Sequence, residues 1–216
     1  MKSKLIDNIT QYHWFLWLFL IVLSSFFLFN YGNHEFSLLV NQNHNELLDF
    51  FFKYVTYLGD GAFVFVMAFV FLFINKEVGI SALISLLITT IFVTILKRGI
   101  YSTEFRPCYH FKSLIDNGTW NLVEGIELHI KYSFPSGHTA SAFCILISMC
   151  FLLNNNFYSF LMVGVAFIIG FSRIYLSQHF LIDVIIGAII GSLIPLFTHI
   201  YIQPIISRKI LKRKIE

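Results

Sequence analysis

Long apolar runs alternate with short polar segments along the chain. The runs cover residues 14–30, 61–75, 79–96, 138–153, 157–174 and 179–201. An α-helix needs about 20 mostly apolar residues to cross the hydrocarbon core of a bilayer. The second run is short, and the stretch Phe50–Leu58 upstream can lengthen it. The pattern predicts an all-α, polytopic integral membrane bundle of about six transmembrane helices.

The composition supports a membrane protein and argues against a soluble one. Of the 216 residues, 57% are hydrophobic and 12% are charged, and the 26 phenylalanines are spread along the chain. One soluble core of this size cannot bury so much apolar surface. We therefore expect a single integral membrane domain over residues 1–216 with no soluble domain attached.

Basic residues near both ends predict the orientation of the helices. An even number of spans places both termini on one side, and the positive-inside rule makes the side rich in Lys and Arg cytoplasmic. The segments 97–137 and 172–178 then lie outside, although they also carry basic residues. We interpret the tail 207–216 as a cytoplasmic anchor at the lipid surface rather than a nucleic-acid arm. The marker residues are Lys2, Lys4, Arg208, Lys209, Lys212, Arg213 and Lys214.

The cysteines do not indicate a metal site or a disulfide framework. Cys108, Cys144 and Cys150 are few and irregularly spaced, and two of them lie in an apolar run. Neither they nor the carboxylates and histidines show the spacing of metal ligands. We expect incidental or membrane-buried thiols.

His179 and Asp183 form the first candidate for chemistry. A carboxylate inside an apolar span is costly unless it is paired. Residues four apart share one face of a helix, so the Asp183 carboxylate can accept the imidazole N–H. That contact leaves the other ring nitrogen free to attack a substrate, as in catalytic triads. The alternative is a structural His–Asp pair that caps a helix.

The segment Pro135-Ser136-Gly137-His138 leads directly into an apolar run. Gly lets the backbone approach a ligand closely, and free N–H groups at the start of a helix form a natural anion site. The alternative is an ordinary helix cap, because Pro and Ser are common at helix starts.

Four basic residues lie close to the expected membrane surface, namely Lys97, Arg98, Arg106 and Arg173. Arg offers a planar fork that suits phosphate oxygens, and Lys supplies a point charge. Such cations can neutralise a phosphoryl group in the transition state. Each of them can instead be a flanking residue that anchors a helix end. We prefer that interpretation for Lys112 and Lys131.

Together, these segments resemble the type 2 phosphatidic acid phosphatase (PAP2) superfamily. Its pattern is Lys-x6-Arg-Pro, Pro-Ser-Gly-His and Ser-Arg-x5-His-x3-Asp. The second motif matches at Pro135–His138 and the third at Ser172–Asp183, spacing included. The resemblance covers a core from about residue 58 to 191. The first motif departs from the pattern, because Lys97 precedes Arg106 by nine positions rather than seven and position 99 is Gly. Either Lys97 or Arg98 fills the basic role, and we favour Lys97.

The resemblance implies a role for each matching residue. His179 is the nucleophile, Asp183 orients it and His138 protonates the leaving oxygen. The phosphoryl oxygens are bound by Lys97, Arg106, Ser136, Gly137 and Arg173. The family needs no metal or other cofactor for this chemistry. Vanadium haloperoxidases share the superfamily, but they are soluble and the apolar composition here argues against them.

The resulting hypothesis is a phosphatase that hydrolyses a phosphomonoester or diphosphate of a lipid-linked substrate through a phosphohistidine. Phosphatidic acid, phosphatidylglycerol phosphate, polyprenyl diphosphate and lipid A are candidate substrates, and loop residues 108–132 are expected to distinguish them. We expect a bacterial inner membrane protein whose site faces the periplasm, with no obligate protein partner. A phosphatase of a soluble ester and a non-catalytic lipid binder or transporter are the alternatives.

Overall fold

The computed structural model describes residues 11–212, and these residues are helical apart from connecting loops and one isolated bridge. In chain order the helices are α2 (Gln11–Gln42), α3 (Glu46–Val55), α4 (Gly61–Ile74), α5 (Lys76–Ile95), α6 (Pro107–His110), α7 (Lys112–Asp116), α8 (Gly137–Leu153), α9 (Asn156–Tyr175), α10 (Leu181–Phe197) and α11 (Gln203–Lys212). Short turns follow α3, α5 and α10, namely η1 (Thr56–Gly59), η2 (Leu96–Ile100) and η3 (Thr198–Ile202). The prediction of an all-α bundle is confirmed.

Short polar residues between the apolar runs determine where the helices begin. The side chains of Asn45, Asp60, Asn75, Ser136 and Asn155 each accept a hydrogen bond from a backbone N–H in the first turn of α3, α4, α5, α8 and α9. These contacts satisfy N–H groups that have no partner within the helix. The apolar pattern thus supplies the helices, and the caps fix their first residues.

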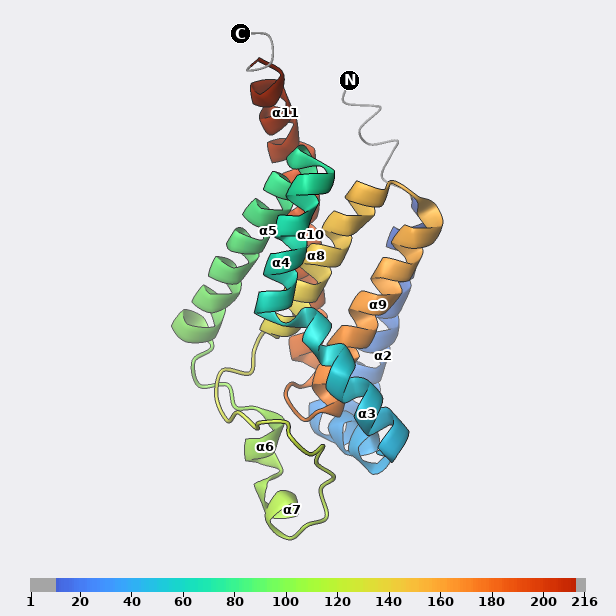
Figure 1. Ribbon diagram of the computed structural model, residues 1–216. Coiled ribbons are helices and arrows are strands. Elements are labelled where there is room, and N and C mark those ends of the chain that lie inside the picture. Colours follow the sequence, from blue (N-terminus) through green and yellow to red (C-terminus); the bar gives the residue numbers. More distant parts are fainter. Residues whose placement is uncertain (1–10, 213–216) are drawn as a thin grey trace.

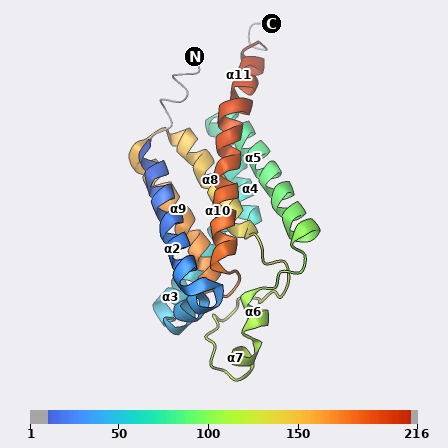
Figure 2. The same cartoon turned by 180° about the vertical axis from the view of Figure 1, so that it is seen from behind.

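The helices form a bundle with α8 at its centre (Figures 1 and 2). Helix α8 packs most extensively against α10 and α9 and also contacts α5 and α4. Its side chains Phe143 and Ile147 are completely buried. Large apolar side chains on the outer helices are exposed instead, among them Phe19, Phe26 and Phe29 of α2 and Phe65, Phe69 and Phe73 of α4. An apolar exterior of this kind requires lipid around it.

Four described helical segments are long and apolar enough to cross a membrane, namely His13–Gln42, Lys76–Ile100, Asn156–Tyr175 and Leu181–Leu211. The pair Glu46–Gly59 and Gly61–Ile74, bent by 52°, makes a fifth span if it is counted as one. Helix α8 is apolar but shorter. Each predicted run falls on one of these helices. The count of six spans is approximate, because two of the six runs fall on a helix of the bent pair and on the shorter α8. The upstream segment leads into the second run, with a bend of 52° between the two helices.

The first predicted run, 14–30, ends too early. Helix α2 continues to Gln42 after a kink at Gly32, whose φ of 68° is the left-handed conformation that favours glycine. The part beyond the kink mixes polar and apolar residues, and there Asn41 exchanges hydrogen bonds with Asn121 of the long loop. The hydropathy pattern detected only the apolar part of the helix.

The two ends of the bundle differ. The start of α2 and helix α11 lie at one end, and α6, α7 and the long loop between α5 and α8 lie at the other (Figures 1 and 2). The predicted markers Lys2, Lys4, Arg213 and Lys214 lie outside the described residues. The three cysteines are free and buried. The sulfur of Cys108 contacts the carbonyl oxygen of His129 at 2.8 Å.

Candidate active site

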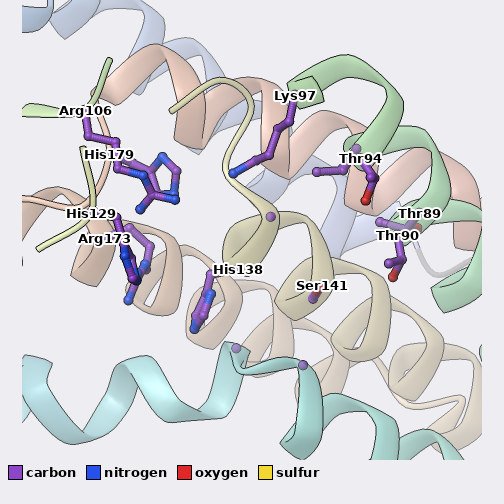
Figure 3. Close-up of a pocket in the computed structure, with 14 residues that line it drawn as sticks. Thr89, Thr90, Thr94, Lys97, Arg106, His129, His138, Ser141, Arg173 and His179 are labelled. Atoms are coloured by element: carbon purple, nitrogen blue, oxygen red, sulfur yellow. The ribbon is translucent and has the colours of Figure 1, made fainter. Parts of the chain in front are cut away.

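The three motifs meet in one cavity of about 400 Å³ (Figure 3). Lys97 reaches it from the end of α5, Arg106 from the long loop and Arg173 from the last turn of α9. Gly137 and His138 belong to the first turn of α8, and His179 lies in the turn between α9 and α10. Of the predicted site residues, these six line the cavity.

His179 and Asp183 are in contact, as predicted, but not on one face of a helix. The Nδ1 atom of His179 lies 3.3 Å from Oδ2 of Asp183, and both side chains are buried. Helix α10 begins only at Leu181, so His179 precedes it. The backbone N–H of His179 donates instead to the carbonyl of Arg173 at 3.0 Å. The reason for the contact is the turn, which folds His179 back over the first turn of α10.

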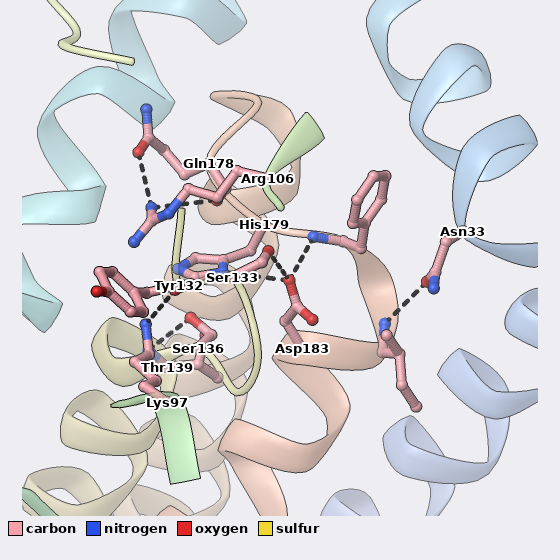
Figure 4. A network of polar contacts seen from close by, with 12 residues as sticks. Asn33, Lys97, Arg106, Tyr132, Ser133, Ser136, Thr139, Gln178, His179 and Asp183 are labelled. Atoms are coloured by element: carbon pink, nitrogen blue, oxygen red, sulfur yellow. Dashed lines mark hydrogen bonds and ion pairs between the residues drawn. The ribbon is translucent and has the colours of Figure 1, made fainter. Parts of the chain in front are cut away.

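The Asp183 carboxylate is fixed by two further donors (Figure 4). Its Oδ2 atom accepts hydrogen bonds from the Ser133 hydroxyl at 2.5 Å and from the backbone N–H of Phe180 at 3.0 Å. A carboxylate accepts, so Nδ1 of His179 carries the proton in this contact. The other ring nitrogen, Nε2, therefore has a free lone pair for attack on a substrate.

The electrostatic surroundings keep the His179 imidazole neutral. Burial, followed by the charges of Arg106, Lys97 and Arg173, holds the pKa of His179 well below its ordinary value of 6.5. Desolvation and nearby cations both disfavour the imidazolium form. A neutral imidazole is the form that can act as a nucleophile at physiological pH.

Three cations face the same cavity without a carboxylate bound to them. Arg106 donates to the carbonyls of Lys131 and Gln178 at 3.0 and 3.2 Å. Arg173 donates to the Thr56 hydroxyl at 2.6 Å, and its buried Nε has no hydrogen-bond partner in the part of the chain described. Within residues 11–212 Lys97, Arg106 and Arg173 form no ion pair. They therefore leave positive charge available for an anion.

Lys97 and Arg98, the two candidates for the basic residue of the first motif, take different positions relative to the cavity. Lys97 lines the cavity and its Nζ donates to the carbonyl of Tyr132 at 3.0 Å. Arg98 is not among the lining residues, and its guanidinium lies 5.9 Å from the centre of the Tyr132 ring. The chain forms a π-helical turn at Leu96–Ile100, which interrupts the regular helix next to the site.

Ser136 does not contribute its side chain to the cavity. The Ser136 hydroxyl is completely buried and pairs with the backbone N–H and the hydroxyl of Thr139 at 3.4 and 2.9 Å. It serves as the N-cap of α8, the alternative considered from the sequence. Gly137, the next residue, lines the cavity in its place.

Several residues at the site were not identified from the sequence. Nε2 of His138 lies 3.8 Å from Oδ2 of Asp60, the residue that caps α4. Further lining residues are Gly59, Gly61, Thr89, Thr90, Val93, Thr94, His129 and Ser141. The hydroxyls Thr89, Thr90 and Thr94 interrupt an apolar run, which is the one signal that would have pointed to a polar face of α5.

Comparisons with known proteins identify the family and the fold of the chain. The family model of the PAP2 superfamily matches residues 78–206. The lipid A 4'-phosphatase of Porphyromonas gingivalis is 32% identical over 69 residues, which cover 32% of this chain and 29% of that protein. The match thus spans less than a third of this relative.

Two solved structures are similar. Aquifex aeolicus LpxE superimposes with a TM-score of 0.67 at 32% identity, over 78% of this chain and 95% of that chain. A transmembrane PAP2-type phosphatidylglycerolphosphate phosphatase from Bacillus subtilis shares the fold, with a TM-score of 0.62 at 21% identity over 95% and 98% of the two chains. The family match covers more than half of the chain, and the chain is therefore an integral membrane protein of the PAP2 superfamily.

Proposed function

We propose that this protein is a membrane phosphatase that releases phosphate from a lipid-linked phosphomonoester or diphosphate through a phosphohistidine at His179. The observation that carries the proposal is the geometry of one cavity. A neutral, oriented imidazole faces three cations, Lys97, Arg106 and Arg173, that have no carboxylate partner. The negative oxygens of a phosphoryl group would be the anionic partner that these three cations do not have in the protein.

In the first step Nε2 of His179 attacks phosphorus and the bond to the ester oxygen breaks. Positive charge develops on the imidazole, and Asp183 stabilises it through the Nδ1–H contact of 3.3 Å. The leaving oxygen takes a proton from His138, which lies at the start of α8. The three cations stabilise the charge on the equatorial oxygens during transfer.

In the second step water attacks phosphorus and the N–P bond breaks. His138, now neutral, accepts a proton from the water. Phosphate leaves, and the neutral imidazole of His179 is restored. His138 is protonated again and His179 is neutral again, as at the start of the cycle. One ester bond and one water molecule have been consumed.

An apolar groove next to the site supports a lipid-linked substrate over a soluble ester. A cavity of about 310 Å³ between α4 and α5 is lined by Val64, Phe65, Leu83, Leu86 and Leu87. It shares Gly61, Thr90 and Ser141 with the phosphate cavity. A headgroup phosphate bound in the polar cavity would place an attached hydrocarbon chain in this groove. A soluble ester has no need of it.

The candidate substrates remain those expected from the sequence: phosphatidic acid, phosphatidylglycerol phosphate, polyprenyl diphosphate and lipid A. A lipid binder or transporter is the weaker alternative, because binding needs no imidazole held in one tautomer by a buried carboxylate. We further propose that residues 1–216 form one domain in a bacterial inner membrane, with the site facing the periplasm and the basic tail 207–216 in the cytoplasm. No obligate protein partner or nucleic acid is part of the proposal.

The decisive experiment is the His179→Ala variant, measured as phosphate release from a panel of the four lipids and one soluble ester. We expect the wild type to hydrolyse at least one lipid and the variant to lose more than about a hundredfold of the rate. His110→Ala is the matched control, because this exposed imidazole is outside the cavity lining. Retention of more than about a hundredth of the rate in a folded variant would contradict the nucleophile assignment.

Metal independence is a separate prediction. Among the described residues no group of three His, Cys, Asp or Glu side chains is placed to hold a metal ion. We expect activity to survive EDTA, because lysine and arginine supply the positive charge, and we expect vanadate to inhibit by occupying the phosphate site. Loss of activity in EDTA, restored by a divalent ion, would assign the enzyme to another mechanism.

A further inference from the structure

A second cavity adjoins the phosphate site on the side of the long loop. Its volume is about 670 Å³, and it shares Thr94, Lys97, Arg106 and His129 with the first cavity. Its remaining walls are Arg98 and the segment Leu128, Ile130, Lys131 and Tyr132. A ligand in the phosphate cavity can therefore extend into this one past Lys97 and Arg106.

The second cavity is strongly basic. Lys97, Arg98, Arg106 and Lys131 line it, and no Asp or Glu is among its lining residues. Phosphoryl transfer as proposed above uses Lys97 and Arg106. It leaves Arg98 and Lys131 without a role, and an anion in this cavity would face both of their charges.

The loop wall is fixed by contacts with the phosphate site itself. The backbone N–H of Arg106 donates to Ile130 at 2.8 Å, and its Nε donates to the carbonyl of Lys131 at 3.0 Å. Tyr132 has a φ of 60°, which a non-glycine residue rarely adopts. Its carbonyl accepts a hydrogen bond from Lys97 (Figure 4). Its ring lies 5.9 Å from the guanidinium carbon of Arg98. Arg98 is thereby held against the loop wall, whereas a lipid anchor would extend along the bilayer.

We propose that this basic cavity binds a second anionic group of the substrate headgroup, separate from the phosphate that is cleaved. Arg98 and Lys131 are then specificity residues, and the preferred substrate is a lipid that carries two anionic groups. This inference rests on the proposed function. It favours phosphatidylglycerol phosphate, polyprenyl diphosphate and doubly phosphorylated lipid A over phosphatidic acid, which has one phosphate.

The test compares matched lipid pairs in the same micelles. One pair is phosphatidylglycerol phosphate and phosphatidic acid with identical acyl chains, and the other is lipid A with two phosphates and with one. We expect the wild type to prefer the two-anion member of a pair. In the double variant Arg98→Gln, Lys131→Gln, the ratio of the two kcat/KM values should fall about tenfold, chiefly through KM. High salt should also weaken the wild-type preference, because the cavity is open to solvent.

Lys112→Gln is the matched control, since Lys112 is an exposed lysine of the same loop that pairs with Asp116 at 3.8 Å. Its ratio should stay at the wild-type value. Activity on the one-phosphate lipid reports in the same preparation that the double variant is folded. An unchanged ratio, an equal fall for both lipids, or a wild type that prefers one anion overturns the inference while the phosphatase proposal stands. Failure of the wild type on every lipid overturns both.

Discussion

At the scale of single residues, carboxylates organise both imidazoles of the site. Asp183 holds His179 and also accepts the Phe180 N–H at the start of α10. Asp60 approaches His138 at 3.8 Å and caps α4 through its other oxygen, which accepts from Ala62 at 2.9 Å. Each carboxylate therefore has two functions: it accepts a backbone N–H at the start of a helix, and it places a negative charge beside an imidazole. The two functions are separable at Asp60, because the two contacts use different oxygens.

The Asp60→Asn variant separates the helix cap from the charge beside His138. Asn is as good an N-cap as Asp, so helix α4 should keep its start and the melting temperature should stay near that of the wild type. The negative charge beside His138 is lost, which disfavours the imidazolium that protonates the leaving oxygen. Because Asp60 is partly exposed, we expect a moderate fall in kcat, roughly threefold to tenfold. The bound phosphoryl group favours this imidazolium, so the alkaline limb of the pH profile of kcat, which reports the enzyme–substrate complex, should move to lower pH when the Asp60 charge is lost.

Rate measurements from pH 5 to 9, together with thermal unfolding, check this prediction. Asp60→Ala is the comparison variant, since it removes both the charge and the cap and should also lower the melting temperature. A profile of Asp60→Asn that coincides with that of the wild type would show that the carboxylate does not assist His138.

Motif spacing predicted most of the side chains that meet at the cavity but not all of their contacts. His179, Asp183, His138, Arg106 and Arg173 were all found from the sequence. Ser133 and Asp60 were not, because an isolated Ser or Asp in a loop has no pattern, and only the fold brings Ser133 to within 2.5 Å of Asp183. Ser136 was assigned to phosphate, whereas its hydroxyl caps α8. Sequence alone did not distinguish a cap from an anion site here.

At the scale of helices, close packing of α8 on α10 brings His138 and His179 to one cavity. A Cβ atom placed on Gly187 would lie 2.7 Å from the carbonyl oxygen of Ser136, and one on Gly191 would lie 2.3 Å from that of Ala140. Both distances are below van der Waals contact with a backbone atom, which cannot move cheaply. Glycine at these two positions sets the separation of the helices.

Gly191→Ala should therefore push α10 away from α8. Overpacking of this kind costs about 1–3 kcal/mol, which corresponds to a fall in melting temperature of roughly 5 °C. Activity should fall as well, because the two histidines lie at the ends of these helices. Gly164→Ala in α9 is the matched control, since nothing lies within 4 Å of its added Cβ. It should leave stability unchanged or raise it slightly. Equal melting temperatures for the two variants would contradict the packing argument.

Hydropathy located the helices well and their ends less well. The starts of α4, α8 and α9 fall within one residue of the predicted runs, because an Asp, Ser or Asn cap stands at each boundary. The sixth run was placed too early by two residues, since His179 and Phe180 precede α10 in a turn. That turn is stabilised by backbone bonds to Arg173, a tertiary detail that leaves no mark on hydropathy.

At the scale of the whole molecule, the two ends of the bundle carry different features. Helices α6 and α7 lie at one end (Figure 1), and the long loop that carries them lines both the phosphate cavity and the basic cavity. Helix α11, with Arg208 and Lys209, lies at the other end. A membrane across the bundle thus separates the site from this basic helix. The positive-inside rule then predicts α11 in the cytoplasm and the site outside, in line with the orientation proposed above.

Cysteine labelling tests this orientation directly. In a background with Cys108→Ser, Cys144→Ala and Cys150→Ala, single cysteines replace Lys112 in α7 and Lys209 in α11, both of which are exposed. Intact cells are treated with a membrane-impermeant maleimide, and permeabilised cells serve as the control for reactivity. We expect labelling at position 112 without permeabilisation and at position 209 only after it, because α7 and α11, which carry these positions, lie at opposite ends of the bundle. The reverse pattern would place the cavity in the cytoplasm. Lipids of the outer leaflet would then be removed from the candidate substrates, since the phosphate site could not reach them.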